Sequence, residues 1–205
     1  MKKPESICIF GDSTAWGAWD MEKGGWVNRL WLYMAGKEEG DSSYANIYNC
    51  SVSGGTTEAI LTRFESEAKI READTLIFQS GGNDSYLKGK GGSNQISPDK
   101  FKQNIEEIIK RAKNITKNIM FIGLKNVDES KTMPVSWKDI YYVNAEIKKY
   151  NEIMENVCRE NNLKYLDIFG LLNKEDFEDG LHPNVIGHEK IFIKVRDFLN
   201  ENQWI

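Results

Sequence analysis

The sequence is poor in the residues and patterns that mark several common functional classes. Its 205 residues include only three cysteines, Cys8, Cys50 and Cys158, which are odd in number, widely spaced and set in apolar surroundings. This usage argues against a disulfide scaffold and against a metal site built from cysteine. It favours buried free thiols in a reducing compartment.

The sequence also lacks an excess of basic residues and any long apolar run. Asp and Glu (31) outnumber Lys and Arg (27), and the formal net charge is −4, which argues against nucleic acid and anionic membranes as partners. No apolar run approaches the roughly 18 residues of a membrane span. The first run, residues 7–10, is also shorter than the roughly 7–15 residues of a signal-peptide core. We therefore expect a cytoplasmic protein that does not associate with membranes.

What the sequence does contain is a regular alternation of two apolar patterns. The length favours a single domain over residues 1–205, and hydrophobic residues make up 40 % of the chain, enough for a full core. Short β-type runs are predicted at 7–10, 46–52, 75–78, 118–124 and 163–169. Helical spacing is found at 26–35, after Thr56 or Thr57, from Pro98, at 137–160 and at 185–199. This alternation predicts an α/β fold with a parallel sheet covered by helices on both faces.

Polar or glycine-containing stretches separate these elements. We expect loops at 36–43, 85–97 and 125–136 and an acidic turn at 174–180. Three predicted strands end directly in glycine turns, Gly11-Asp12-Ser13, Ser53-Gly54-Gly55 and Gly81-Gly82-Asn83. Because ligands of open parallel sheets bind at the carboxyl ends of the strands, these three turns are expected to meet at one site.

The residues of these turns suit acyl transfer. Ser13 offers a hydroxyl nucleophile and, at a helix start, a backbone N–H for a developing oxyanion. Gly54 offers an N–H that no side chain obstructs, and Asn83 offers a neutral amide donor. The base must be one of two histidines. His188 falls inside the last helix, where we expect it on the surface or packed against it. His182 follows Asp179 by three residues in a turn, so the Asp179 carboxylate can fix its tautomer.

These residues occur in four segments that resemble the SGNH hydrolases, also called the GDSL lipase/esterase family. The segments are Phe10-Gly-Asp-Ser-Thr14, Asn49-Cys-Ser-Val-Ser-Gly54-Gly-Thr-Thr57, Gly81-Gly-Asn83-Asp84 and Asp179-Gly-Leu-His182-Pro-Asn184. The resemblance spans nearly the whole chain. Thr14 stands where the family's name-giving leucine would be, a departure that touches no catalytic atom.

The resemblance implies a flavodoxin-like three-layer α/β/α sandwich with a five-stranded parallel sheet. It also implies a serine esterase that cleaves small esters or thioesters and needs no metal or organic cofactor. Its partner would be a small-molecule ester substrate. The implied triad is Ser13, His182 and Asp179, and the implied oxyanion donors are Ser13, Gly54 and Asn83. The same site could instead serve an acyltransferase or a carbohydrate deacetylase.

Other residues near the expected site carry weaker signals. Asp12 and Asp84 are interpreted chiefly as turn-forming residues. The candidate substrate-binding residues are Asp12, Trp16, Met133 and Trp137, with Trp19 beside them, although tryptophans in a chain of this size also commonly belong to the core.

Two other functional classes match the sequence less well. A nucleotide- or phosphate-binding module would fit the fold, but Gly89-Lys90-Gly91 lacks the spacing and hydroxyl of a phosphate-binding loop. A lipase of the α/β-hydrolase type fits poorly. Its Gly-x-Ser-x-Gly elbow would require glycine where Ala15 stands, and its nucleophile follows more than one strand.

Overall fold

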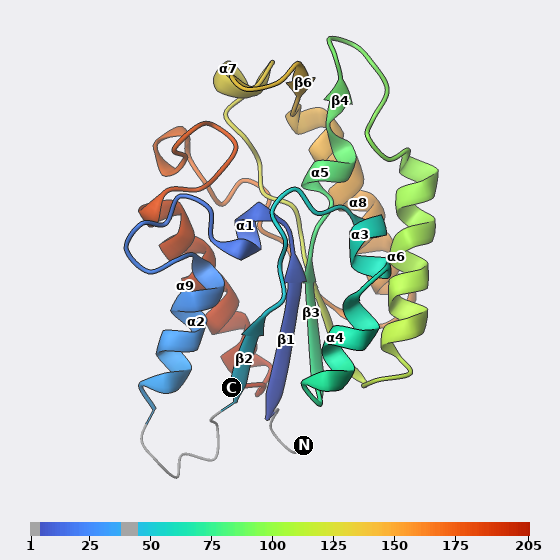
Figure 1. Cartoon of the computed structure of the whole chain (residues 1–205), viewed down its shortest axis with the longest axis vertical. Helices are drawn as coiled ribbons and strands as arrows, with labels where there is room; N and C mark the ends of the chain where they lie inside the picture. Colours follow the sequence, from blue (N-terminus) through green and yellow to red (C-terminus); the bar gives the residue numbers. More distant parts are fainter. Residues whose placement is uncertain (1–4, 38–44) are drawn as a thin grey trace.

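A central parallel sheet organises the structure, a computed structural model that describes residues 5–37 and 45–205 (Figure 1). The strand order is β2-β1-β3-β5-β7, formed by Asn46–Asn49, Ser6–Gly11, Thr75–Gln79, Asn118–Ile122 and Lys164–Leu166. All four neighbouring pairs are parallel. The predicted three-layer fold with five parallel strands is confirmed. Most of the predicted loop 36–43 lies outside the described residues.

Helices cover both faces of this sheet. On one face lie α2 (Trp26–Ala35) and α9 (Val185–Glu201). On the other lie α3 (Thr57–Leu61), α4 (Phe64–Ile70), α6 (Pro98–Ala112) and α8 (Asn144–Glu160) (Figure 1). Two short helices, α1 (Ser13–Trp16) and α5 (Gly82–Ser85), follow β1 and β3 directly. The layers therefore leave the carboxyl ends of the strands free of long helices.

The two-residue period of the strands divides the core into two halves. In β1, Cys8 and Phe10 face the helices α3, α4, α6 and α8, while Ile7 and Ile9 face α2 and α9. Stacked and edge-on rings of Phe10, Phe64 and Phe78 fill the first half, with centroids 5.6–6.0 Å apart. Because both faces of the sheet are covered at its centre, β1, β3 and β5 carry apolar runs without polar alternation. The edge strand β2 is exposed at three of its four residues.

Element ends and short elements differ from the sequence predictions. β2 ends at Asn49, β5 at Ile122 and β7 at Leu166, all earlier than predicted. The loop predicted at 125–136 contains the short helix α7 (Glu129–Thr132), and the turn at 174–180 contains the 3-10 helix η1 (Lys174–Asp176). Strand pairing stops where the chain turns toward the sheet edge, so apolar residues beyond that point extend the pattern without extending the strand.

The helix predicted at 137–160 is wrong over its first seven residues. Residues Ile140–Tyr141 form β6, which pairs antiparallel with β4, Leu87–Lys88, inside the loop predicted at 85–97. The helix α8 begins only at Asn144. The run Ile140-Tyr-Tyr-Val143 is β-branched and aromatic and therefore favours extended backbone when a partner strand is available.

None of the helices in residues 5–37 and 45–205 is both long and apolar enough to cross a membrane.

Candidate active site

The candidate nucleophile lies where β1 ends and α1 begins. A Cβ atom on Gly11 would lie 2.5 Å from the Cβ of Ala15 and 2.7 Å from the carbonyl oxygen of Gln79. Only glycine therefore allows β1 to turn this closely into α1. The Asp12 carboxylate caps α1 by accepting the N–H of Thr14 at 2.9 Å. Ser13 is held as the first residue of that helix.

Three predicted residues from the two ends of the chain meet here. Ser13 Oγ lies 2.9 Å from His182 Nε2, and His182 Nδ1 lies 2.7 Å from Asp179 Oδ2. Since the ionised Asp179 carboxylate can only accept, Nδ1 carries the proton and Nε2 accepts from the Ser13 hydroxyl. The geometry is that of a nucleophile, a base and an orienting carboxylate.

The Asp179 carboxylate is held ionised. Its burial would raise the pKa, but hydrogen bonds outweigh this effect and hold the pKa of Asp179 at about 2. The donors are the His182 ring and the backbone N–H groups of His182 and Leu181. The same bonds close the turn at 179–182, so one carboxylate both shapes the loop and orients the imidazole.

Candidate oxyanion donors come from two further turns. Gly54 has φ +76°, a left-handed backbone that favours glycine, and a Cβ there would meet nothing within 4 Å. Among the described residues, neither the Gly54 N–H nor the Ser13 N–H has an acceptor within the protein. Asn83 donates from Nδ2 to the Gly55 carbonyl oxygen at 3.0 Å, and its Oδ1 accepts from the Tyr142 hydroxyl at 2.7 Å.

The candidate substrate-binding residues differ in how far they are exposed to solvent. Trp137 is 53 % exposed, and its ring stacks on His182 with centroids 6.1 Å apart and planes 24° apart. Trp16, Trp19 and Met133 are also about half exposed. Asp12 is buried instead, so its carboxylate lies beneath the surface that a substrate would touch.

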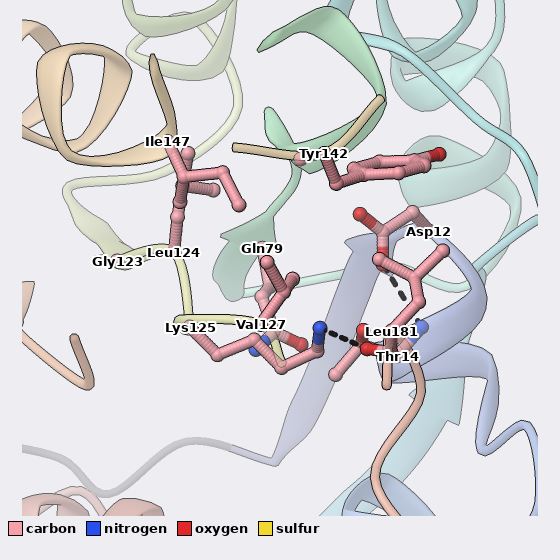
Figure 2. Close-up of a pocket in the computed structure, with 11 residues that line it drawn as sticks. Asp12, Thr14, Gln79, Gly123, Leu124, Lys125, Val127, Tyr142, Ile147 and Leu181 are labelled. Atoms are coloured by element: carbon pink, nitrogen blue, oxygen red, sulfur yellow. Dashed lines mark hydrogen bonds between the residues drawn. The ribbon is translucent and has the colours of Figure 1, made fainter. Parts of the chain in front are cut away.

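A small cavity of about 30 Å³ lies behind the nucleophile, lined by residues that include Asp12, Lys125 and Tyr142 (Figure 2). The buried Lys125 ammonium donates to the carbonyl oxygen of Leu181, next to His182 in the chain. Burial lowers the pKa of Lys125 to about 8, against the attraction of the Asp12 and Asp179 carboxylates. Burial raises the pKa of Asp12, against the Thr14 N–H and the Lys125 charge.

Lys125 and Tyr142 are the residues at this site that the sequence predictions missed. Lys125 lies in a stretch predicted to be a polar loop, and Tyr142 lies in one predicted to be a helix. A lone lysine in a loop is usually solvated, so only its burial reveals a role. Tyr142 lies within the β-branched and aromatic run Ile140-Tyr-Tyr-Val143, and that run is the signal against the helix.

The buried Asp84 carboxylate links the turn that carries Gly54 to the turn that carries Asn83. Its carboxylate accepts from the backbone N–H and the hydroxyl of Thr57, and Asn104 donates to that hydroxyl at 2.9 Å. Burial raises the pKa of Asp84 to about 7, against the hydrogen bonds from Thr57. This network holds the segment after Gly54 against the segment that carries Asn83.

The other histidine, His188, is fully buried in α9 and far from solvent. Its Nε2 lies 2.9 Å from the Ala18 carbonyl oxygen and therefore carries a proton, while its Nδ1 accepts the N–H of Trp26 at 3.3 Å. Burial lowers the pKa of His188 to about 4. His188 is thus packed rather than exposed, and it ties the segment after α1 to α2 and α9.

Stability should depend on pH through His188. Between pH 6.5 and about 4, His188 is protonated in the unfolded chain but stays neutral in the native protein. The free energy of unfolding therefore falls as the pH falls through this window. A shift of this size corresponds to about 3 kcal/mol. We expect His188→Gln to remove that loss, so that its free energy of unfolding declines less than that of the unsubstituted protein across this window.

Urea unfolding at several pH values measures this difference. Comparison with the variant is needed because the raised pKa of Asp84 contributes with the opposite sign over the same window. The lowered pKa values of Asp20 and Asp179, both about 2, act only below about pH 4. Parallel pH profiles of the two proteins between pH 4 and 6.5 would contradict the assignment.

Comparison with known proteins identifies relatives across most of the chain. A model of the GDSL-like lipase/acylhydrolase family matches residues 9–190. The GDSL esterase/lipase WDL1 of Oryza sativa subsp. japonica is 22 % identical over 153 residues, which cover 69 % of this chain and 58 % of the rice protein. The chain therefore matches little more than half of that relative's length.

Solved structures share the fold over nearly the full length. The lipase/acylhydrolase from Enterococcus faecalis superposes with a TM-score of 0.74 at 22 % identity, covering 97 % of this chain and 96 % of that one. Axe2, an acetylxylan esterase from Geobacillus stearothermophilus, gives a TM-score of 0.72 at 17 % identity, covering 98 % and 96 %.

Proposed function

Because the chain belongs to the GDSL-like lipase/acylhydrolase family, we propose that it is a carboxylic ester hydrolase acting through Ser13, His182 and Asp179. One observation carries the proposal. The Ser13 hydroxyl, the His182 ring and the Asp179 carboxylate form a continuous hydrogen-bonded chain, with distances of 2.9 and 2.7 Å. A surface serine has no need of such partners, whereas acyl transfer requires them.

Acylation begins with Ser13. Its Oγ attacks the carbonyl carbon of the ester while His182 Nε2 takes the hydroxyl proton. The imidazolium that forms is stabilised by the Asp179 carboxylate, which stays ionised because its pKa lies at about 2. The face of Trp137 lies parallel to the same ring and adds favourable interaction with its positive charge.

The negative charge on the tetrahedral intermediate requires donors. The backbone N–H groups of Ser13 and Gly54 and the free N–H of the Asn83 amide supply three. These donors are held before the substrate arrives, so little reorganisation accompanies the reaction. His182 then protonates the leaving alcohol or thiol, and the acyl group remains on Ser13. Water activated by His182 attacks this ester and releases the acid.

The substrates we propose are small esters or thioesters. Trp16, Trp19, Met133 and Trp137 expose apolar surface, and Trp137 touches the ring of the proposed base. Apolar walls with few polar groups are typical of sites for small organic ligands. The alcohol or acyl group would pack against these side chains, and the buried Asp12 would support the turn rather than contact the substrate.

The proposal is tested with p-nitrophenyl esters of increasing acyl length, a matching thioester series and acetylated sugars. Labelling with a fluorophosphonate accompanies the assay. We expect hydrolysis of at least one series and labelling of one serine per chain. Esters formed with added alcohols or sugars would identify an acyltransferase. Absence of both turnover and labelling, combined with thermal stabilisation by nucleotides, would contradict the proposal and favour a nucleotide-binding module.

A further inference from the structure

We propose that Tyr142 is a positioning residue of the esterase site: its hydroxyl holds the Asn83 amide in the one orientation that presents an N–H to the oxyanion. The inference rests on the proposed function and adds to it a residue outside the four segments that resemble the family motifs. Tyr142 lies between β6 and α8 and reaches Asn83 across 59 positions of the chain.

The contacts of Asn83 determine how its amide is turned. The Gly55 carbonyl oxygen can only accept a hydrogen bond, so the Asn83 atom 3.0 Å away must be Nδ2. The oxygen Oδ1 then faces Tyr142, whose hydroxyl donates to it at 2.7 Å. An amide nitrogen carries two protons, and Gly55 takes one of them. The second remains for an oxyanion.

The Tyr142 contact matters because an asparagine amide has little torsional preference of its own. The terminal χ2 torsion is broad and nearly two-fold, so external hydrogen bonds decide which end faces the site. If Oδ1 turned toward the substrate, it would repel the oxyanion that Nδ2 should stabilise. Tyr142 removes that alternative by giving Oδ1 a donor on the side away from the substrate.

Tyr142 is itself held from several directions. Its N–H donates to the Thr132 carbonyl oxygen at 3.0 Å, and the Thr132 hydroxyl donates to the Tyr142 carbonyl oxygen at 2.8 Å. Its ring packs edge-on against Tyr86 at 5.5 Å between centroids, and only 4 % of the residue is exposed. Burial also raises the pKa of Tyr142 well above its ordinary value. The hydroxyl therefore stays protonated and remains a donor over the pH range of an esterase assay.

The test is Tyr142→Phe, which removes one oxygen atom and keeps the ring. We expect kcat to fall about tenfold, the effect of losing one oriented hydrogen bond, with KM changed less than about twofold. Tyr141→Phe is the matched control, because Tyr141 is the preceding residue and does not contact Asn83. It should leave kcat unchanged.

A double-mutant cycle separates positioning from a general structural effect. Asn83→Ala should lower kcat by roughly 10²–10³, the usual effect of losing an oxyanion donor. In that background, Tyr142→Phe should change kcat no further, because the amide it orients is gone. Rates are normalised to the fraction of protein that a fluorophosphonate titrates, so that loss of folded protein does not resemble a loss of kcat.

Three results would overturn the inference, two of them from Tyr142→Phe and one from Asn83→Ala. Tyr142→Phe could leave kcat unchanged, or it could lower kcat by the same factor with and without Asn83. Failure of the proposed function has a different signature, namely no ester hydrolysis by the unsubstituted protein. Full activity of Asn83→Ala would remove Asn83 from the oxyanion site and with it the role of Tyr142.

Discussion

Replacing Ser13 with alanine is expected to lower kcat for ester hydrolysis by a factor on the order of 10⁴ or greater. The substitution deletes the one oxygen atom that lies 2.9 Å from His182 Nε2. It keeps the backbone N–H groups of the proposed oxyanion site. Residual hydrolysis would come from those donors acting on a water molecule, without an acyl-enzyme. Fluorophosphonate labelling should disappear together with turnover.

The fold should survive this change, because Ser13 begins a helix whose cap comes from Asp12. The thermal midpoint therefore serves as an internal check. Ser66→Ala, at an exposed serine of α4, is the control for nonspecific labelling and should behave like the unsubstituted protein. Ester hydrolysis by Ser13→Ala at a near-native rate would contradict the nucleophile assignment.

The second large effect is expected for Asp179→Asn, with a fall in kcat of roughly 10³–10⁴. Asparagine keeps an oxygen for the N–H groups of Leu181 and His182, which now donate to Asp179 Oδ1. The loop at 179–182 should therefore keep its conformation. The other oxygen, however, becomes an NH₂ group that donates toward His182 Nδ1. The imidazole then carries its proton on Nε2, where it can no longer accept the Ser13 proton.

The control for Asp179→Asn is Glu178→Gln. It removes the same charge from the preceding residue, which is exposed, and should leave kcat within about twofold of the unsubstituted value. Measured rates of fluorophosphonate labelling should fall with kcat in Asp179→Asn, since both reactions need an activated Ser13. Retention of more than a tenth of the activity by Asp179→Asn would show that this carboxylate does not set the tautomer.

Much of the fold could be predicted from local patterns. The central strands β1, β3 and β5 carry buried apolar runs that lie between polar or glycine residues, because both faces of the sheet are covered there. The edge strands β2 and β7 are shorter and partly exposed, and their local signal is weaker. Alternation with helices then leaves few arrangements besides a parallel sheet with two helical layers. The candidates Ser13, Asn83, Asp179 and His182 were equally visible, because each lies in a short turn whose residue types are unusual together.

Other features depended on contacts between distant segments. The pairing of β4 with β6 decides that residues 140–143 are extended, although their apolar spacing also suits a helix. His188 resembles any histidine on an amphipathic helix until the Ala18 and Trp26 backbones enclose it. Periodicity describes one segment at a time, so it carries no information about which partner a segment will meet.

The sequence alone therefore determined the architecture and the proposed reacting groups, because both can be recognised from short, contiguous stretches of residues. Only the tertiary structure decided how those groups are oriented. It brought Tyr142 to the amide of Asn83, Lys125 to the carbonyl of Leu181 and His182 to within 2.9 Å of Ser13. Hydrogen bonds of this kind act over a few ångströms and join residues far apart in the chain, so they exist only once the layers have packed.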